Sequence, residues 1–126
     1  MKTVEIGKLG ENIAAKFLRK HGYKVIEKNI HISHNEIDII AKNKEYIIFV
    51  EVKTRSTDER LRADFGTPAS AVTQAKQQRT VSAARGYLKS GKYSKLQPRF
   101  DVVEVYLNKD DHKTLHINHI INAFGA

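Results

Sequence analysis

Residues 36–54 read EIDIIAKNKEYIIFVEVKT, and this stretch decides the fold. Two runs rich in Ile, Val and Phe, residues 36–42 and 46–54, flank the polar residues 43–45. β-Branched and aromatic runs separated by a short polar turn are typical of a β-hairpin. Because both runs are apolar at most positions, we expect strands that are covered on both faces.

Three charged residues interrupt these apolar runs, namely Asp38, Glu51 and Lys53. The two-residue period of a strand places Glu51 and Lys53 on the same face. A hairpin symmetric about a turn centred between Lys44 and Glu45 places Asp38 opposite Glu51. Two carboxylates that face each other at about 5 Å repel unless a positive charge lies between them. This pairing depends on the register, because a one-residue slip would turn Asp38 to the other face.

The chemistry of this set is that of phosphate ester hydrolysis. Mg²⁺ prefers hard oxygen ligands and commonly takes one or two carboxylates, with substrate and water completing its shell. We therefore expect Asp38 and Glu51 to hold Mg²⁺ or Mn²⁺. Lys53 would orient the attacking water or neutralise charge that develops at phosphorus. The alternative is an ordinary exposed Glu51–Lys53 ion pair, against which the apolar surround argues, since an unpaired charge there is costly.

The remaining chain predicts two helices and further strands. Apolar spacing predicts helices over residues 4–21 and about 73–90, the second ended by Gly91 and turning Ala75, Val81, Ala84 and Leu88 to the core. Short strands are expected at residues 23–29, 99–107 and 114–118. We expect a polar loop at residues 31–35, a long loop at 55–66, a turn at 108–113 and an apolar tail at 120–124. The fold class that follows is α/β, with a mixed, mainly antiparallel sheet of about four or five strands flanked by helices.

The length of the chain indicates a single domain, and its positive charge indicates an anionic partner. The 126 residues are enough for one core and too few for two, so a single domain over residues 1–126 is expected. Its 22 Lys and Arg against 14 Asp and Glu give a formal net charge of +8. Residues 66–99 contain no acidic residue, so the second helix and the segment that follows it form a basic face. Such a face attracts phosphate backbones through counterion release. The alternative is an ordinary solvent-exposed helix face. The residues expected to contact nucleic acid are Arg55, Lys76, Arg79, Arg85 and Lys89.

Several other classes are excluded or disfavoured. The absence of Cys removes disulfides, thiolate zinc sites and cysteine nucleophiles. No apolar run approaches the roughly 20 residues of a membrane span, and residues 1–10 are too polar for a signal peptide, so we expect a cytoplasmic protein with no membrane association.

Three smaller motifs are better explained by structure. The GxxG at residues 7–10 matches a nucleotide-clamping loop, but close helix packing explains its glycines better. A zinc site of His112, His116 and His119 is disfavoured because their segment alternates like a strand. Arg99 and Asp101, which alternate on one strand, are expected to form a cross-strand ion pair or to support the site from behind.

Asp38, followed thirteen residues later by Glu51-Val52-Lys53, resembles the motif of the PD-(D/E)xK nuclease superfamily, whose members share the restriction-endonuclease-like fold. Ile37 stands where the superfamily name has Pro, a position at which Pro is often missing. The whole chain resembles the YraN family of small bacterial proteins, which are described as endonucleases and are similar in their core to archaeal Holliday junction resolvases. The matching stretches are residues 7–11, Asn29, residues 36–40, 49–55, 99–103 and 122–124.

This resemblance implies a metal-dependent endonuclease that hydrolyses DNA phosphodiester bonds, with branched or damaged DNA as the substrate class. It implies that Glu11 joins Asp38 and Glu51 as a metal ligand, and that Gln74 or Lys76 lends a polar group. It also implies a homodimer. Two alternatives stay open: a nucleic-acid-binding module that keeps the fold without cutting, and a structural protein that binds an acidic partner.

Overall fold

The computed structural model describes residues 3–57 and 72–125. Its elements follow in the order α1 (Thr3–Lys20), β1 (Lys24–Ile32), β2 (Asn35–Lys42), β3 (Tyr46–Thr57), α2 (Gln74–Leu88), β4 (Gln97–Asn108) and β5 (Thr114–Phe124). The strands form one sheet in chain order, in which β3 and β4 are parallel and the other neighbours antiparallel. The expected α/β fold with a mixed sheet is confirmed, and it is consistent with a restriction-endonuclease-like core.

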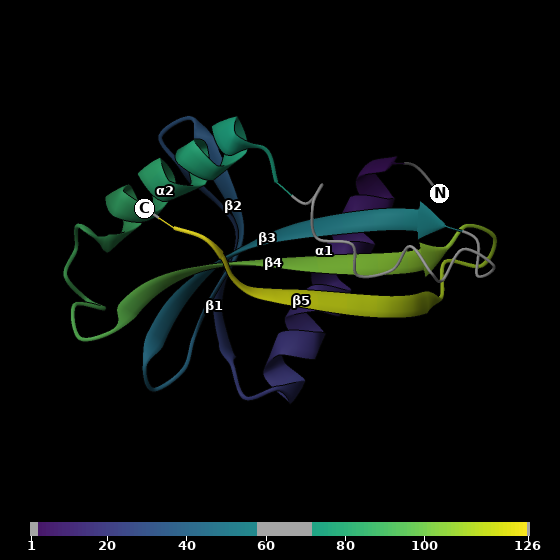
Figure 1. Ribbon diagram of the computed structural model, residues 1–126, viewed down its shortest axis with the longest axis horizontal. Coiled ribbons are helices and arrows are strands. Elements are labelled where there is room, and N and C mark those ends of the chain that lie inside the picture. Colours follow the sequence, from purple (N-terminus) through teal and green to yellow (C-terminus); the bar gives the residue numbers. More distant parts are fainter. Residues whose placement is uncertain (1–2, 58–71, 126) are drawn as a thin grey trace.

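The two helices cover opposite faces of the sheet, which confirms that the hairpin strands are buried on both sides. On one face α1 packs Ala14, Ala15 and Leu18 against apolar residues of β2, β3 and β4. On the other face α2 packs Val81, Ala83 and Ala84 against residues that include Phe49 and Phe100. Figure 1 shows the strong twist that rotates β1 and β2 away from β3, β4 and β5.

Each helix boundary has a local cause. Thr73 caps α2, because its Oγ1 accepts a hydrogen bond from the Lys76 amide at 3.2 Å. Gly22, with φ +90°, takes the left-handed conformation that ends α1. No helix within the described residues combines the length and hydrophobicity needed to cross a membrane.

Gly10 sets the distance between α1 and β3. A Cβ added at Gly10 would lie 1.8 Å from Oγ1 of Thr54, so only glycine allows the helix to approach this closely. Gly7 has nothing within 4 Å of the equivalent position. Close packing therefore explains one glycine of the GxxG motif and not the other.

Three expectations about the strands were wrong. The loop expected at residues 31–35 is a two-residue turn, because β1 continues to Ile32 and Ser33 adopts a φ of +56°. The loop expected at residues 55–66 begins later, because β3 continues to Thr57 along its parallel partner β4, and residues 58–66 lie outside the described part of the chain. The segments at 114–118 and 120–124 form the single strand β5, whose ladder shifts register between Phe100 and Val102 instead of ending.

The second helix buries a slightly different set from the one expected. Val81 and Ala84 are buried as predicted, together with Thr80 and Ala83. Ala75 is exposed, because the first turn of α2 precedes the part of the helix that packs on the sheet.

Candidate active site

The register of the β2–β3 hairpin brings Asp38 and Glu51 together as expected. Ile39 pairs with Val50 and Lys42 with Ile47, and the recorded pairing ends at Ile39. Beyond that point Oδ2 of Asp38 accepts a hydrogen bond from the Val52 amide at 2.8 Å. The carboxylate of Asp38 therefore lies where the two strands begin to separate.

Burial and mutual repulsion disturb the ionisation of this pair. Glu51 is only 6% exposed, and burial raises its pKa to about 7, with the charge of Asp38 acting in the same direction. Burial also raises the pKa of Asp38, although the Val52 amide and Lys76 act against it. Each carboxyl thus affects the protonation of the other. At neutral pH the pair therefore needs a proton or a cation.

Glu11 reaches this region from α1. Its Oε2 atom is buried and has no hydrogen-bond partner within residues 3–57 and 72–125. Burial raises the pKa of Glu11, and the charge of Asp38 raises it further, while a hydrogen bond with the Asn29 side chain lowers it. Gly10, the preceding residue, makes this close approach of α1 sterically feasible.

Two lysines supply positive charge beside the carboxyls. Nζ of Lys76, in the first turn of α2, lies 3.7 Å from Oε2 of Glu51. Lys53 is half-buried on β3, and its charge also lowers the pKa of Glu51. Of the two residues considered in α2, Lys76 therefore contacts the site, while Gln74 is exposed and lines a separate hollow with Gly125.

Arg55, expected to contact nucleic acid, forms an ion pair with a buried acid while its side chain stays partly exposed. Its Nη2 and Nε atoms lie 3.1 and 3.2 Å from Oε2 of Glu104, a residue with no solvent exposure. The Asn118 amide donates to the other carboxylate oxygen at 2.9 Å. Glu104 is also the ladder partner of Lys53, so it holds the Arg55 side chain close to β3 at the position of Lys53.

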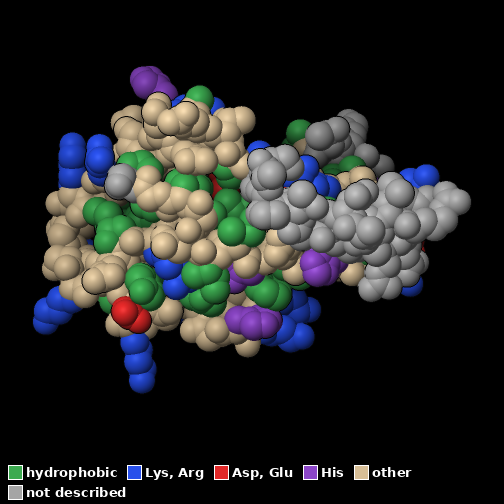
Figure 2. Space-filling model, in the orientation of Figure 1, with side chains coloured by type: hydrophobic (Ala, Val, Ile, Leu, Met, Phe, Trp, Pro, Cys, Tyr) green, Lys and Arg blue, Asp and Glu red, His purple; other side chains and the backbone are tan. Residues whose placement is uncertain are grey.

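The remaining basic residues of α2 face solvent. Arg79, Arg85 and Lys89 are exposed. In the space-filling view of Figure 2, Lys and Arg side chains project from the left end of the molecule, where α2 leads into β4. These residues lie on the molecular surface, and Arg79 follows Lys76 by one turn of α2.

The donor set fits one hard cation but does not form a complete cage. No three Asp, Glu, His or Cys side chains in residues 3–57 and 72–125 converge closely enough to hold a metal ion by themselves. Asp38 and Glu51 are nonetheless two hard oxygen donors with raised pKa values, and Glu11 has a buried oxygen that finds no partner among the described residues. Mg²⁺ commonly uses one or two carboxylates and completes its shell with water and substrate oxygens.

The sequence interpretation missed Glu36 as a neighbour of the site. Its charge raises the pKa of both Glu11 and Asp38. The available signal was the strand period, because Glu36 precedes Asp38 by two residues and therefore shares its face.

A second polar cluster is structural. Arg99 donates to Asp101 from Nε at 2.9 Å and from Nη2 at 2.8 Å, so this ion pair lies within β4 and not across strands. The cross-strand partner of Asp101 is His119, whose Nε2 lies 2.8 Å away. Arg99 also reaches the Tyr23 hydroxyl at 2.9 Å. His119 is thereby engaged with a buried carboxylate.

The fold and the site define an α/β protein with a carboxyl pair, half-buried Asp38 and buried Glu51, where two sheet strands separate. The family model described as "Uncharacterised protein family UPF0102" matches residues 10–105. The chain belongs to this family, also called the YraN family, as the resemblance of its motifs predicted. Asp38, Glu51, Lys53 and Glu11 all lie within the matched residues.

Similar family members come from several bacteria. The UPF0102 protein of Caldanaerobacter subterraneus subsp. tengcongensis is 47% identical over 119 residues, covering 94% of this chain and 93% of that protein. A UPF0102 protein of Clostridium perfringens is 44% identical over 119 residues, with the same coverage of 94% and 93%. A UPF0102 protein of Dictyoglomus thermophilum is 40% identical over 124 residues, covering 98% of this chain and 100% of that protein.

Proposed function

We propose that this protein is a metal-dependent endonuclease that hydrolyses DNA phosphodiester bonds. The observation that carries the proposal is the neighbouring pair of half-buried Asp38 and buried Glu51, which the hairpin register places opposite each other and whose pKa values are both raised. Lys76 lies 3.7 Å from this pair, and Lys53 lies on the same strand as Glu51. Facing carboxylates beside lysines suit the binding of a divalent cation together with an anionic phosphate.

The residues take distinct roles in this proposal. Asp38 and Glu51 would hold Mg²⁺ or Mn²⁺, and Glu11, whose Oε2 has no hydrogen-bond partner in the described part of the chain, would support the same ion, with water filling the positions that the three side chains do not close by themselves. When bound, such an ion polarises the phosphate and lowers the pKa of water. Lys53 orients the attacking water, and Lys76, released from Glu51, pairs with a phosphate oxygen. The Val52 amide keeps Asp38 in position throughout.

The basic surface of α2 accounts for substrate binding. Arg79, Arg85 and Lys89 are exposed on one helix and can neutralise backbone phosphates without reading sequence. Branched or damaged DNA is the proposed substrate class. A homodimer would present two such sites to a junction with two-fold symmetry.

The test is cleavage of labelled single-stranded, duplex, flapped and four-way-junction DNA with Mg²⁺ or Mn²⁺. Wild type is compared with Glu51→Ala and Lys53→Ala, and with Asp110→Ala and Lys16→Ala as matched controls at exposed positions. We expect products that require metal, vanish in both site variants and persist in both controls. Binding without cleavage of any substrate would overturn the proposal.

One observation favours a second function, a nucleic-acid-binding module that does not cut. Lys76 already offsets the charge of Glu51 without a metal ion. The two functions differ in their response to metal, because an ion that binds the folded state raises the melting temperature. A melting temperature unchanged by Mg²⁺ and Mn²⁺, with DNA binding intact, would favour the binding module.

A further inference from the structure

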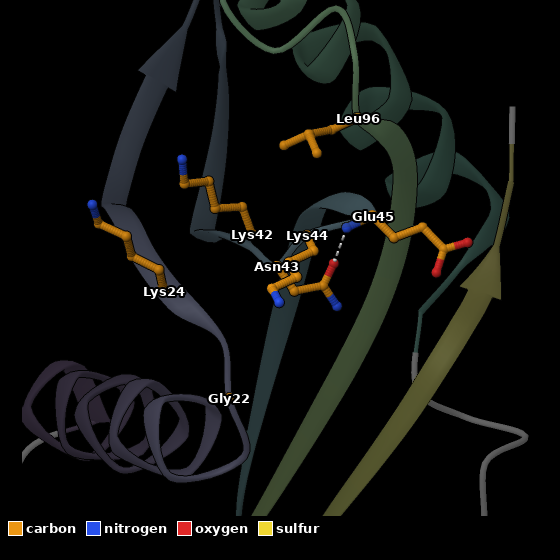
Figure 3. Close-up of a pocket in the computed structure, with 7 residues that line it drawn as sticks. All are labelled: Gly22, Lys24, Lys42, Asn43, Lys44, Glu45 and Leu96. Carbon is orange, nitrogen blue, oxygen red and sulfur yellow. Dashed lines mark hydrogen bonds between the residues drawn. The ribbon is translucent and has the colours of Figure 1, made fainter.

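A lysine-lined hollow lies at the end of the sheet where β2 turns into β3. Its volume is about 750 Å³, and it is lined by Gly22, Lys24, Lys42, Asn43, Lys44, Glu45 and Leu96. In Figure 3, the side chains of Lys24 and Lys42 extend in the same direction from adjacent strands, while the Glu45 carboxylate points away from them. The hollow therefore presents positive charge from two strands and a turn.

Lys24 and Lys42 are a like-charged pair across two strands. They are direct partners in the β1–β2 ladder, a position in which equal charges destabilise a sheet. No carboxylate among residues 3–57 and 72–125 forms an ion pair with Lys24, Lys42 or Lys44. The described neighbour of Lys42 is instead the ring of Tyr93, whose centroid lies 5.7 Å from its Nζ. An anion in the hollow would relieve this repulsion.

Backbone contacts fix the walls of the hollow in advance. Oδ1 of Asn43 accepts hydrogen bonds from the amides of Glu45 and Tyr46 at 2.9 and 2.7 Å, which sets the turn that carries Lys44. The Gln97 amide donates to the Glu45 carbonyl at 2.9 Å and ties β4 to this turn. A ligand would therefore meet lysines on an ordered frame, with less ordering cost on binding.

A neighbouring hollow extends the charge. It has a volume of about 360 Å³ and shares Lys42 and Leu96 with the first, adding Lys92, Tyr93, Ser94 and Lys95. Nζ of Lys92 lies 5.6 Å from the centroid of the same Tyr93 ring. Five lysines spread over two adjoining hollows suit an extended polyanion better than a single small phosphate.

The distance from the carboxyl pair to the two hollows can be estimated along β2 and along α2. Asp38 and Lys42 are four residues apart on β2, about 14 Å along a strand. On the surface, α2 begins at the site with Lys76 and ends just before the loop that carries Lys92 and Tyr93. Its 15 residues span about 22 Å, the length of some six or seven nucleotides at about 3.4 Å each.

We infer that Lys24, Lys42 and Lys44 form a second phosphate-binding site, which holds the nucleic-acid backbone about four to seven nucleotides from the position of cleavage. This inference rests on the proposed function for the identity of its ligand. A free polyphosphate shares the same chemistry and is the other source of phosphate to be tested.

The test compares wild type with the triple variant Lys24→Gln/Lys42→Gln/Lys44→Gln. Its matched control is Lys8→Gln/Lys16→Gln/Lys20→Gln, which removes the same charge from exposed positions of α1. Binding is measured by fluorescence anisotropy without metal, on single strands of about 4 and about 20 nucleotides, because a strand of about 4 is too short to occupy both sites at once. We expect the pocket variant to lose about tenfold in affinity for the longer strand and far less for the shorter, with a reduced salt slope. The pocket variant should melt at or above the wild-type temperature, because it removes a repulsion.

Equal losses in the pocket variant and the control would overturn the inference. Two measurements with tripolyphosphate separate nucleic acid from free polyphosphate as the ligand: competition with bound DNA, and the shift in melting temperature that tripolyphosphate causes. If only tripolyphosphate binding depends on the three lysines, the nucleic-acid assignment is wrong. If wild type cleaves DNA but the three lysines do not affect binding, the inference fails while the proposed function stands. If wild type cleaves nothing, the proposed function fails, and the length-dependent binding still decides the role of the pocket.

Discussion

The Val52 amide donates a 2.8 Å hydrogen bond to Oδ2 of Asp38 and so ties the carboxylate of β2 to the strand that carries Glu51. The donor is a backbone group, and therefore only a proline at position 52 would remove it. Asp38 is held in place beside Glu51 even though both groups are negative when ionised. The folded hairpin therefore keeps the two carboxylates close together despite their repulsion.

Asp38→Asn should lower the pKa of Glu51 below its wild-type value of about 7, because one cause of the elevation is the charge of Asp38. The pKa should remain above the ordinary value of 4.5, since burial is the largest cause. NMR titration of the Glu51 side-chain carboxyl measures both values. An unchanged pKa would show that the two carboxyls do not interact.

Glu51→Gln should stabilise the metal-free protein at pH 8 but not at pH 4. The folded-state pKa of Glu51 is about 7 and its ordinary value is 4.5, so the folded state binds the proton more tightly. This contribution to stability is complete below 4.5 and is lost as the pH rises through about 7. Because Gln does not titrate, the free energy of unfolding of Glu51→Gln in urea should exceed that of wild type by on the order of 2 kcal/mol, and this difference should appear as the pH rises over this interval. The same type of substitution at an exposed acid, Asp110→Asn, should leave the free energy of unfolding equal to that of wild type at both pH values. A difference between Glu51→Gln and wild type that does not change with pH would contradict the account.

Gly10→Ala should destabilise the protein by about 1–3 kcal/mol, since the new Cβ meets Thr54 and forces α1 away from β3. The matched control is Gly7→Ala in the same helix, where nothing lies within 4 Å and better helix propensity should stabilise by up to about 1 kcal/mol. Denaturant unfolding measures both changes. Mn²⁺ binding should also weaken in Gly10→Ala, because Glu11 moves with the helix, and equal effects of the two substitutions would disprove the packing role.

Asp101→Ala should destabilise by about 3–5 kcal/mol, because it leaves the buried guanidinium of Arg99 without its acid. Burial would raise the pKa of Asp101, but hydrogen bonds from His119, Arg99 and the Asn122 amide outweigh it and lower the pKa. The stabilisation is thus present above the ordinary value of 3.8 and is lost at lower pH. Urea unfolding at neutral and acidic pH measures this effect. A loss of DNA affinity without a loss of stability would show that the cluster is functional instead of structural.

The central hairpin was predictable because its information is local. Residues 43–45 form the turn, the two apolar runs form the strands, and the symmetric register places Asp38 beside Glu51. The same alternation predicted that Glu51 and Lys53 share a face. Physical reasoning from period and turn length was therefore sufficient for the pair that carries the proposed chemistry.

The rest depends on contacts between distant segments. The approach of Glu11 follows from the packing of Gly10 on Thr54, which no spacing reveals. Arg55 was expected at a nucleic-acid surface, but its partner Glu104 lies 49 residues away on a parallel strand. The polar residues 31–35 indicated a loop, yet His31 belongs to an edge strand that exposes alternate side chains, and only residues 33 and 34 form the turn.

The central claim is that Asp38 and Glu51 serve a metal-dependent nuclease. Its most direct test is the cleavage of one labelled four-way junction in Mn²⁺ by wild type, Glu51→Gln and the exposed control Asp110→Asn, with binding measured in parallel. The account predicts cleavage by wild type and the control, a loss of at least about a hundredfold in Glu51→Gln, and equal binding by all three. Equal cleavage by Glu51→Gln and wild type, or binding without cleavage by any of them, would contradict it.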